Sequence, residues 1–217
     1  MFDGAAPGDG PALAYTPDLL QHAGVASWPF GELRRGWYRT ILADPPWAFR
    51  LHSDAGDAKS PQHHYNCMDL ADIQALPVAD LADPEGCALV MWATAPMMPQ
   101  ALATLAAWHF AFKTMGTWAK RSRTGGAWAF GTGYVFRSAA EFYLVGTRGR
   151  PELAARNVRN LIVAPTREHS RKPDQLRHDL ERLFQPPRAE LFAREATQGW
   201  DAWGNQVGKF TPEAAHG

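Results

Sequence analysis

The sequence predicts an α/β domain with a mostly parallel sheet flanked by helices. Short apolar runs alternate with amphipathic segments along the chain, which is typical of a parallel sheet wrapped by helices. A length of 217 residues with 46% hydrophobic content suits one well-packed domain and is too short for two ordinary ones. We expect an N-terminal arm at 1–37, the domain at 38–208 and a flexible tail at 209–217.

Apolar runs mark the expected strands. The run Cys87–Ala93 is continuously apolar, as in a parallel strand covered on both faces. The other expected strands are 38–43, 110–120, 140–147, 161–163 and 189–193.

Three segments have the apolar spacing of helices. One is the short stretch 69–76, and another is the alanine-rich stretch 96–108, with Leu102, Leu105 and Ala106 expected to face inward. The third begins near Pro173, a residue that suits the first helical position. Its expected buried stripe consists of Leu176, Leu180, Leu183 and Phe184.

The first strand ends in Asp44-Pro45-Pro46-Trp47. The prolines prevent the strand from continuing, and Asp44 is held extended because it precedes a proline. Ligands of open α/β sheets bind beyond the carboxyl ends of strands. We therefore expect the Asp44 carboxylate and the Pro45 carbonyl to hold the two N–H groups of an exocyclic amine, with Trp47 stacked on the ring. The alternative is an aspartate that caps a turn beside a core tryptophan.

These residues resemble the catalytic motif of the MT-A family of seventy-kilodalton type, the adenine methyltransferases of the eukaryotic mRNA methylation writer and their prokaryotic and phage relatives. The resemblance spans 38–207. Its further motifs are Tyr65, Trp92, 118–120, 170–174, 190–194 and 203–206. It implies a Rossmann-like fold that uses S-adenosylmethionine to methylate the exocyclic amine of adenine in nucleic acid. DNA is favoured over RNA, because compact single-domain prokaryotic relatives are mostly taken as DNA-modifying.

The resemblance also implies roles for individual residues. The catalytic set is Asp44, Pro45, Pro46 and Trp47, and Tyr65 lines the acceptor pocket at the end of a long polar segment, 48–66, that suits a lid. The cofactor set is Asp44, Lys172, Arg194, Asn205 and Gln206. Lys172, beside a helix N-terminus, would bind the methionine carboxylate, and the last three would lie near the ribose. The writers carry a histidine and an asparagine where this chain has Ala196 and Thr197, so the ribose contacts have less support than the carboxylate contact.

The segment 121–133 is rich in glycine and arginine and contains Trp128 and Phe130. Basic residues interleaved with aromatic ones fit contact with an unstacked strand, so Lys120, Arg121 and Arg123 are expected to bind the substrate. The related writers use the equivalent loop in a dimer interface, and a homodimer is therefore also open. The net charge is zero, but residues 113–182 carry 14 basic and 6 acidic side chains. This asymmetry predicts a basic face, with an ordinary solvated surface as the alternative.

Composition excludes several classes of protein. Cys67 and Cys87 lack the spacing of a disulfide framework or a zinc site, and the pair His63-His64 has no third ligand nearby, so we expect no metal. No signal peptide or bilayer-length apolar run is visible, and a cytoplasmic setting is expected. Two other functions stay open: a catalytically silent subunit that binds S-adenosylmethionine, and an amino-methyltransferase acting on a small molecule or a protein.

Overall fold

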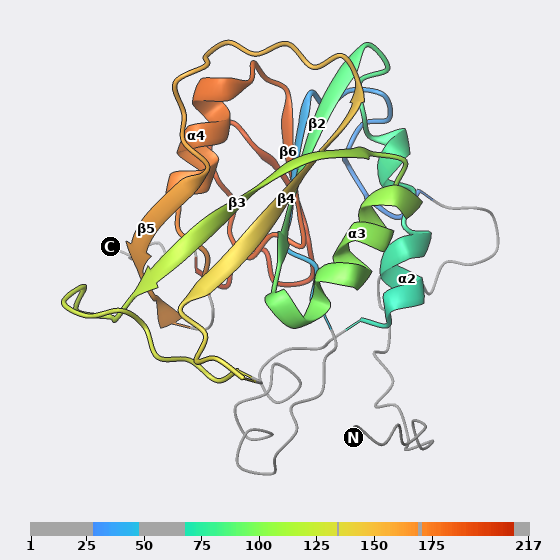
Figure 1. Cartoon of the computed structure of the whole chain (residues 1–217). Coiled ribbons are helices and arrows are strands. Elements are labelled where there is room, and N and C mark those ends of the chain that lie inside the picture. Colours follow the sequence, from blue (N-terminus) through green and yellow to red (C-terminus); the bar gives the residue numbers. More distant parts are fainter. Residues whose placement is uncertain (1–27, 48–67, 134, 169–170, 211–217) are drawn as a thin grey trace, which may run out of the picture.

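The computed structural model describes residues 28–47, 68–133, 135–168 and 171–210 (Figure 1). Within them, seven strands form one sheet in the order β5-β3-β4-β2-β1-β6-β7. The strands are β1 Thr40–Ala43, β2 Gly86–Ala93, β3 Ala111–Arg121, β4 Ala140–Gly149, β5 Leu161–Pro165, β6 Arg188–Leu191 and β7 Asp201–Trp203.

The sheet is mixed and mostly parallel. Strand β1 pairs in parallel with β2 and β6, β6 with β7, and β3 with β5. Among the described strands only β4 runs the other way, antiparallel to β2 and β3. The predicted α/β class, of the Rossmann-like type found in methyltransferases that use S-adenosylmethionine, is confirmed.

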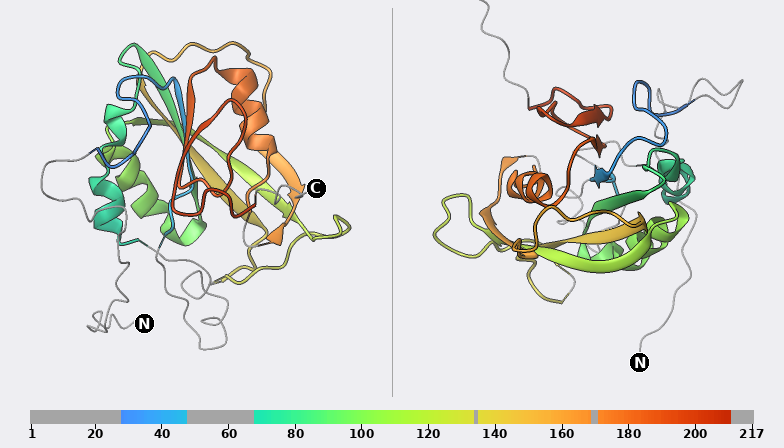
Figure 2. Two further views of the ribbon diagram at one scale, coloured as in Figure 1. Left: turned by 180° about the vertical axis from the view of Figure 1, so that it is seen from behind. Right: turned by 90° about the horizontal axis from the view of Figure 1, so that it is seen from above.

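Helices cover both faces of the sheet. Figure 2 shows α2 and α3 on one face and α4 on the other. The helices are α2 Leu70–Ala75, η2 Val78–Asp80, η3 Ala95–Met97, α3 Met98–Ala107 and α4 Gln175–Leu183. None of the helices in the described ranges combines the length and apolar character needed to cross a membrane.

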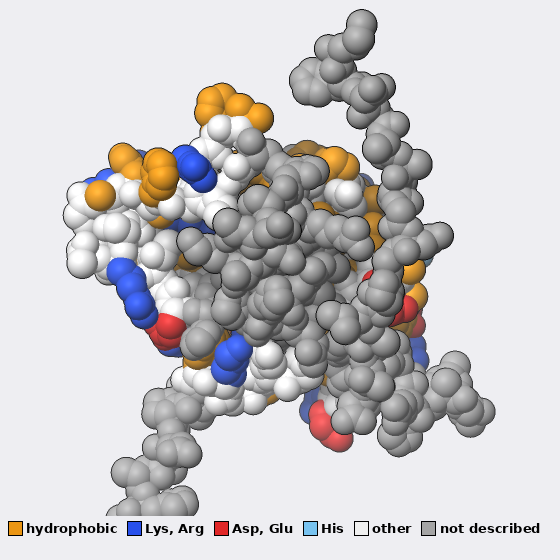
Figure 3. Space-filling model, turned by 90° about the horizontal axis from the view of Figure 1, so that it is seen from below, with side chains coloured by type: hydrophobic (Ala, Val, Ile, Leu, Met, Phe, Trp, Pro, Cys, Tyr) orange, Lys and Arg blue, Asp and Glu red, His pale blue; other side chains and the backbone are white. Residues whose placement is uncertain are grey.

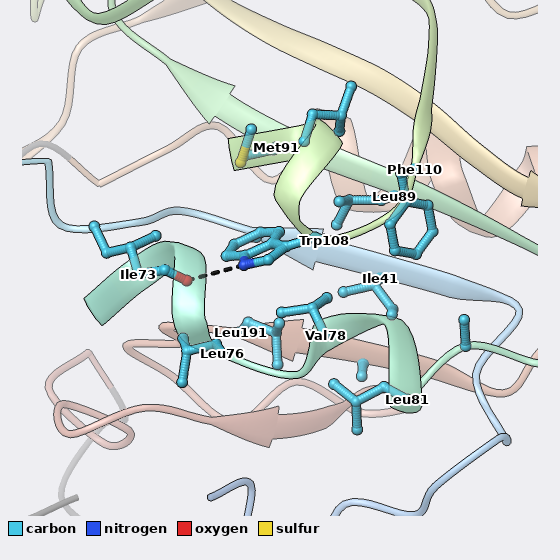
Figure 4. Close-up of a cluster of buried hydrophobic side chains, with 14 of the residues drawn as sticks. Ile41, Ile73, Leu76, Val78, Leu81, Leu89, Met91, Trp108, Phe110 and Leu191 are labelled. Atoms are coloured by element: carbon cyan, nitrogen blue, oxygen red, sulfur yellow. Dashed lines mark hydrogen bonds between the residues drawn. The ribbon is translucent and has the colours of Figure 1, made fainter. Parts of the chain in front are cut away.

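Strand β2 lies at the centre of the core, and all eight of its residues are buried. Leu89 and Met91 point into the cluster under α2 and α3, whereas Val90 and Trp92 point into the cluster under α4. A strand buried on both faces is expected to be continuously apolar, as this one is. Figure 4 shows the first cluster, where the indole N–H of Trp108 donates to the Ile73 carbonyl at 2.9 Å.

The inward face of α3 differs from the predicted one. Leu102 is 39% exposed and Ala106 is also exposed, whereas Leu105 is buried as expected. The buried side chains of the helix are Ala101, Thr104 and Leu105. Because Trp108 follows at the same helical spacing and fills the space under α2, it fixes which stripe of the helix faces the sheet.

Strand β7 and the residues before Tyr38 also differ from the sequence-based expectation. Strand β7 was not predicted, because three residues are too few for a periodic signal. Residues before Tyr38 join the core: Phe30 is 1% exposed, and the indole of Trp203 donates to the Pro29 carbonyl. The segment from residue 28 therefore lies against the β7 end of the sheet.

Candidate active site

A pocket opens beyond the carboxyl ends of β1 and β6. These ends lie at the lower edge of the molecule in Figure 1. The lining includes Asp44, Lys172, Glu190, Arg194 and Phe210. Asp44, Lys172 and Arg194, which are far apart in the sequence, thus meet in one cavity.

The backbone around Asp44 explains how its side chain reaches this pocket. The amide of Asp44 donates to the Leu191 carbonyl at 3.3 Å, which extends the pairing of β1 with β6 by one residue. Two prolines then end the strand, and the Trp47 amide donates back to the Pro45 carbonyl at 2.8 Å. The Asp44 side chain is 18% exposed and accepts from two basic side chains.

Trp47 lies deeper than the sequence suggested. Its side chain is 6% exposed and belongs to the core cluster under α2 and α3. Its indole N–H donates to the Trp92 carbonyl at 3.0 Å. This bond ties the end of the Asp44–Trp47 segment to β2, the most buried strand.

A row of alternating charges runs along one side of the pocket. The Lys172 Nζ lies 3.0 Å from Asp44 Oδ1 and 3.0 Å from Glu141 Oε1. Arg194 Nη2 donates to Asp44 Oδ2 at 2.9 Å, and Lys120 Nζ lies 2.7 Å from Glu141 Oε2. Lys120, predicted to contact substrate, is thus paired with a carboxylate on β4.

The middle of this row stays ionised although it is buried. Burial by itself would raise the pKa of the Glu141 carboxyl, but Lys172 and Lys120 bring it down to about 2. Burial would likewise lower the pKa of the Lys172 ammonium, yet Asp44 and Glu141 raise it above its usual range. The row therefore presents fixed charges to the pocket in a region where screening by water is weak.

Glu190, on β6, is a second acidic side chain of the pocket and is 12% exposed. Burial raises the pKa of its carboxyl to about 7, against the opposing effect of Arg177. Among the described residues its Oε2 accepts no hydrogen bond, and the nearest basic atom, Arg177 Nε, lies 3.4 Å away. This oxygen is thus buried beside a guanidinium without a hydrogen bond.

The residues after Arg194 are tied to α4 by ion pairs. Glu195 pairs with Arg177 and also with Arg171, whose Nη2 lies 2.6 Å from Glu195 Oε2. Arg177 further donates to Thr197 Oγ1 at 2.6 Å. Thr197 is one of the two positions where the chain departs from the writers, and here it supports the pocket wall through Arg177.

The segment that carries Lys172 is also fixed. Arg167 makes a bidentate pair with the Asp174 carboxylate at 2.8 and 2.9 Å and donates to the Lys172 carbonyl. Helix α4 begins at Gln175, so Pro173 precedes the helix rather than opening it. Lys172 therefore owes its position to this clamp and to Asp44 and Glu141.

The remaining predicted residues do not line the described pocket. Asn205 and Gln206 follow β7, and Gln206 Oε1 accepts from Lys209 at 3.3 Å. Gly204 before them lies so close to the segment after β6 that an added Cβ would lie 2.6 Å from the Ala193 carbonyl oxygen. The turn therefore passes directly beside the start of the Arg194 loop.

Tyr65 and the predicted lid lie outside the described residues, as does the pair His63-His64. Within the described ranges, no group of three or more His, Cys, Asp or Glu side chains is placed to hold a metal ion. Arg121 is the last residue of β3, and Arg123 lies on the connection between β3 and β4.

Sequence reasoning missed Glu141 and Glu190 as site residues. Each is a carboxylate flanked on both sides by apolar residues of its strand, and that contrast was the available signal. Glu141 pairs with Lys172, which lies in a loop later in the chain, and Glu190 pairs with Arg177, which lies in a helix earlier in the chain. These pairings appear only in the folded structure.

Comparisons with known proteins agree with this geometry. The MT-A70 family model matches residues 38–206. The chain is 30% identical over 197 residues to the Type II methyltransferase M.MunI of a Mycoplasma species, a match that covers 82% of this chain and 81% of the relative.

Eukaryotic relatives are longer. The chain is 31% identical over 196 residues to the N(6)-adenosine-methyltransferase MT-A70-like protein of Arabidopsis thaliana, covering 85% of this chain and 27% of the relative. It is 27% identical over 177 residues to the human N(6)-adenosine-methyltransferase catalytic subunit METTL3, covering 79% of this chain and 28% of the relative. The family match and the similarity to the Mycoplasma enzyme show that the chain belongs to the MT-A70 family.

Proposed function

We propose that this protein transfers a methyl group from S-adenosylmethionine to the exocyclic amine of adenine in nucleic acid, with DNA favoured over RNA. The observation that carries the proposal is the pocket in which Asp44 meets Lys172 and Arg194. Membership of the MT-A70 family supports the reaction class, and the name of the Mycoplasma relative, a Type II methyltransferase, supports DNA.

The residues of the pocket fit S-adenosylmethionine. Lys172 and Arg194 supply positive charge for a carboxylate and donors for hydroxyl groups. The Glu190 side chain adds a carboxyl group to the lining of the same pocket. When bound, S-adenosylmethionine supplies a methyl group on a sulfonium that already carries its leaving group.

Asp44 has the central role in this proposal. A carboxylate can accept about four hydrogen bonds, and Lys172 and Arg194 use only part of that capacity. The remaining lone pairs can hold the amine hydrogens and turn the amine nitrogen toward the methyl group. The Pro45 carbonyl already accepts from Trp47 and retains a second lone pair for the same amine.

Lys172 and Glu141 serve as positioning residues. Lys172 holds one side of Asp44, and Glu141 holds Lys172 from the opposite side. Because the charges are paired before any substrate arrives, little reorganisation is needed when positive charge develops on the amine. Lys120 contributes by neutralising the second oxygen of Glu141.

Trp47 is proposed to anchor the Asp44–Trp47 segment, since its ring is buried and its N–H is bonded to β2. Stacking of Trp47 on the base, closure by Tyr65 and ribose contacts by Asn205 and Gln206 stay predictions. We also retain as a proposal an arm at 1–37, a catalytic domain at 38–208 and a tail at 209–217, in a cytoplasmic setting. Residues from 28 of the arm pack against the domain, and Phe210 of the tail lines the pocket.

The test is incubation of the protein with S-adenosylmethionine carrying a labelled methyl group and with DNA or RNA in parallel, followed by nucleoside analysis. We expect labelled N(6)-methyladenine, mainly from DNA. Asp44→Asn keeps the size of the side chain and removes its charge, and should lower the rate by at least about 10²–10³-fold, the scale for losing one preorganised electrostatic group.

Each alternative function gives a different result in this assay. Cofactor binding without transfer to any acceptor would indicate a silent subunit. Transfer only to a small molecule or a protein would indicate another amino-methyltransferase. Equal rates for the wild type and Asp44→Asn would overturn the role of Asp44.

A further inference from the structure

The connection between β3 and β4 forms a basic and aromatic projection, which we call the β3–β4 finger (residues 122–133 and 135–139). It is ordered by its own backbone hydrogen bonds: Ala129 donates to Lys120, and Lys120 donates to Ala139. Two further bridges join Arg121 to Trp128 and Gly131 to Ser138. The finger is therefore a pair of consecutive hairpin turns on the end of the sheet.

Large apolar side chains of the finger point into solvent. Phe130 is 80% exposed, Val135 86%, Phe136 86% and Trp128 57%. Soluble proteins rarely leave so many large apolar side chains exposed on one short segment unless the surface binds something. Burying these side chains in a complex would recover hydrophobic free energy that the free protein lacks.

The same segment is positively charged. Between Lys120 and Ala140 the chain has three arginines and no acidic residue. Arg121 lies over the Trp128 ring at 4.4 Å, and Arg137 lies over the Phe130 ring at 5.3 Å. A guanidinium next to an aromatic ring offers a phosphate contact and a stacking plate side by side.

The finger lies at the rim of the candidate active site. Lys120 at its base pairs with Glu141, which pairs with Lys172 of the pocket. Arg123 Nη2 lies 3.8 Å from Glu168, and Glu168 lies 4.0 Å from the pocket residue Arg171. Figure 3 looks onto this edge from below and shows hydrophobic and basic side chains side by side along one rim.

We propose that the β3–β4 finger binds unpaired nucleotides next to the target adenine. Phe130 and Phe136 would stack on unstacked bases, and Arg123 and Arg137 would contact the phosphates. This inference rests on the proposed function and adds the state of the substrate. A continuous duplex hides the faces of its bases, so a single strand or a locally opened duplex is the preferred substrate.

The test measures binding of fluorescent DNA of one sequence as a single strand, as a duplex with an unpaired adenine and as a continuous duplex, over a series of salt concentrations. We expect the continuous duplex to bind most weakly. Phe130→Ala with Phe136→Ala should weaken binding to the single strand by about 5- to 150-fold for each base that loses its stacking partner, without changing the salt dependence.

The charge variant separates the two contributions. Arg123→Gln with Arg137→Gln should weaken binding and reduce the slope of log K against log salt by about 0.7 for each lost phosphate contact on a single strand. The matched control is Leu153→Ala with Arg156→Gln, since both side chains are exposed on the β4–β5 connection at the opposite edge of the sheet (Figure 1). This control should bind like the wild type.

The outcomes distinguish the finger from the proposed function. If the wild type methylates nucleic acid and both finger variants keep its Kd, salt slope and KM, the finger proposal is overturned and the function stands. If the finger variants lose binding but the wild type methylates neither DNA nor RNA, the proposal that the finger binds nucleotides is supported and the proposed function is overturned. Light scattering measures the oligomeric state of each variant. If the finger variants change only the oligomeric state, the finger is an interface between two copies of the chain and the proposal is overturned.

Discussion

The active-site pocket and the β3–β4 finger lie on the same edge of the sheet, but they hold basic side chains in opposite ways. Lys172 and Arg194 are 15% and 16% exposed and share the Asp44 carboxylate. Arg123 of the finger is 73% exposed, and its nearest carboxylate lies 3.8 Å away. The pocket uses positive charge to fix one acidic group, whereas the finger leaves positive charge for a partner.

This difference changes how the charge of the sequence is understood. Residues 113–182 carry 14 basic and 6 acidic side chains, which predicted a basic face. Four of those basic residues, Lys120, Arg171, Lys172 and Arg177, are in ion pairs with carboxylates at the pocket. The basic side chains outside this network include Arg123 and Arg137 of the finger, but also Arg150, Arg156 and Arg159 on the β4–β5 connection. The basic face is therefore smaller than the count suggested.

The largest expected effect is a loss of folding stability when a buried charge beside the pocket is removed. Glu141→Gln removes the charge that Lys172 and Lys120 share. Breaking a buried ion pair by changing one partner typically costs about 3–5 kcal/mol, because the other charge is left without compensation. Urea unfolding should show this loss of stability. If Glu141→Gln unfolds at the same urea concentration as the wild type, the row of charges does not stabilise the fold.

The next effect concerns pH. Burial raises the pKa of Glu190 to about 7, so the folded protein holds this proton more tightly than the unfolded chain does. The stability from Glu190 is complete below its unfolded pKa and is lost as pH rises from about 4.5 to 7, by up to about 3 kcal/mol. Glu190→Gln should have a flatter profile of unfolding free energy over this range. An unchanged slope would show that Glu190 titrates normally.

A smaller effect is expected on cofactor binding. Lys172→Ala should weaken the binding of S-adenosylmethionine by about 1–3 kcal/mol if the ammonium pairs with the methionine carboxylate. Isothermal titration calorimetry gives the dissociation constant directly. Because Lys172 also neutralises Asp44, Lys172→Arg serves as the control that keeps the charge. An identical dissociation constant for all three proteins would exclude the contact.

The smallest effect is expected in the finger. Arg123→Gln should change the free energy of unfolding by no more than about 0.5 kcal/mol, as is usual for exposed positions. The urea midpoint measures this change beside that of Glu141→Gln. A large loss of stability would show that Arg123 supports the fold, and the contrast between the two regions would disappear.

Local patterns in the sequence predict most of the strands and helices and part of the site. The continuous apolar run of β2 and the Asp44-Pro45-Pro46-Trp47 motif predicted a buried strand and the end of another, because hydrophobic continuity and proline chemistry act locally. The ordered motifs also identified Lys172 and Arg194, and both line the pocket with Asp44.

Which residues form ion pairs with one another, and which line the same pocket, follows from the folded structure. Glu141 and Lys120 lie on neighbouring strands, Lys172 comes from the segment before α4, and Glu190 comes from β6. The sequence left Trp47 open as a stacking plate or a core residue, and in the fold its ring is buried and its indole donates to a carbonyl of β2. Such pairings depend on the order of the strands in the sheet and on which side chains are buried. The spacing of residues along the sequence does not predict either of these, so several site residues could be identified from the sequence but their partners could not.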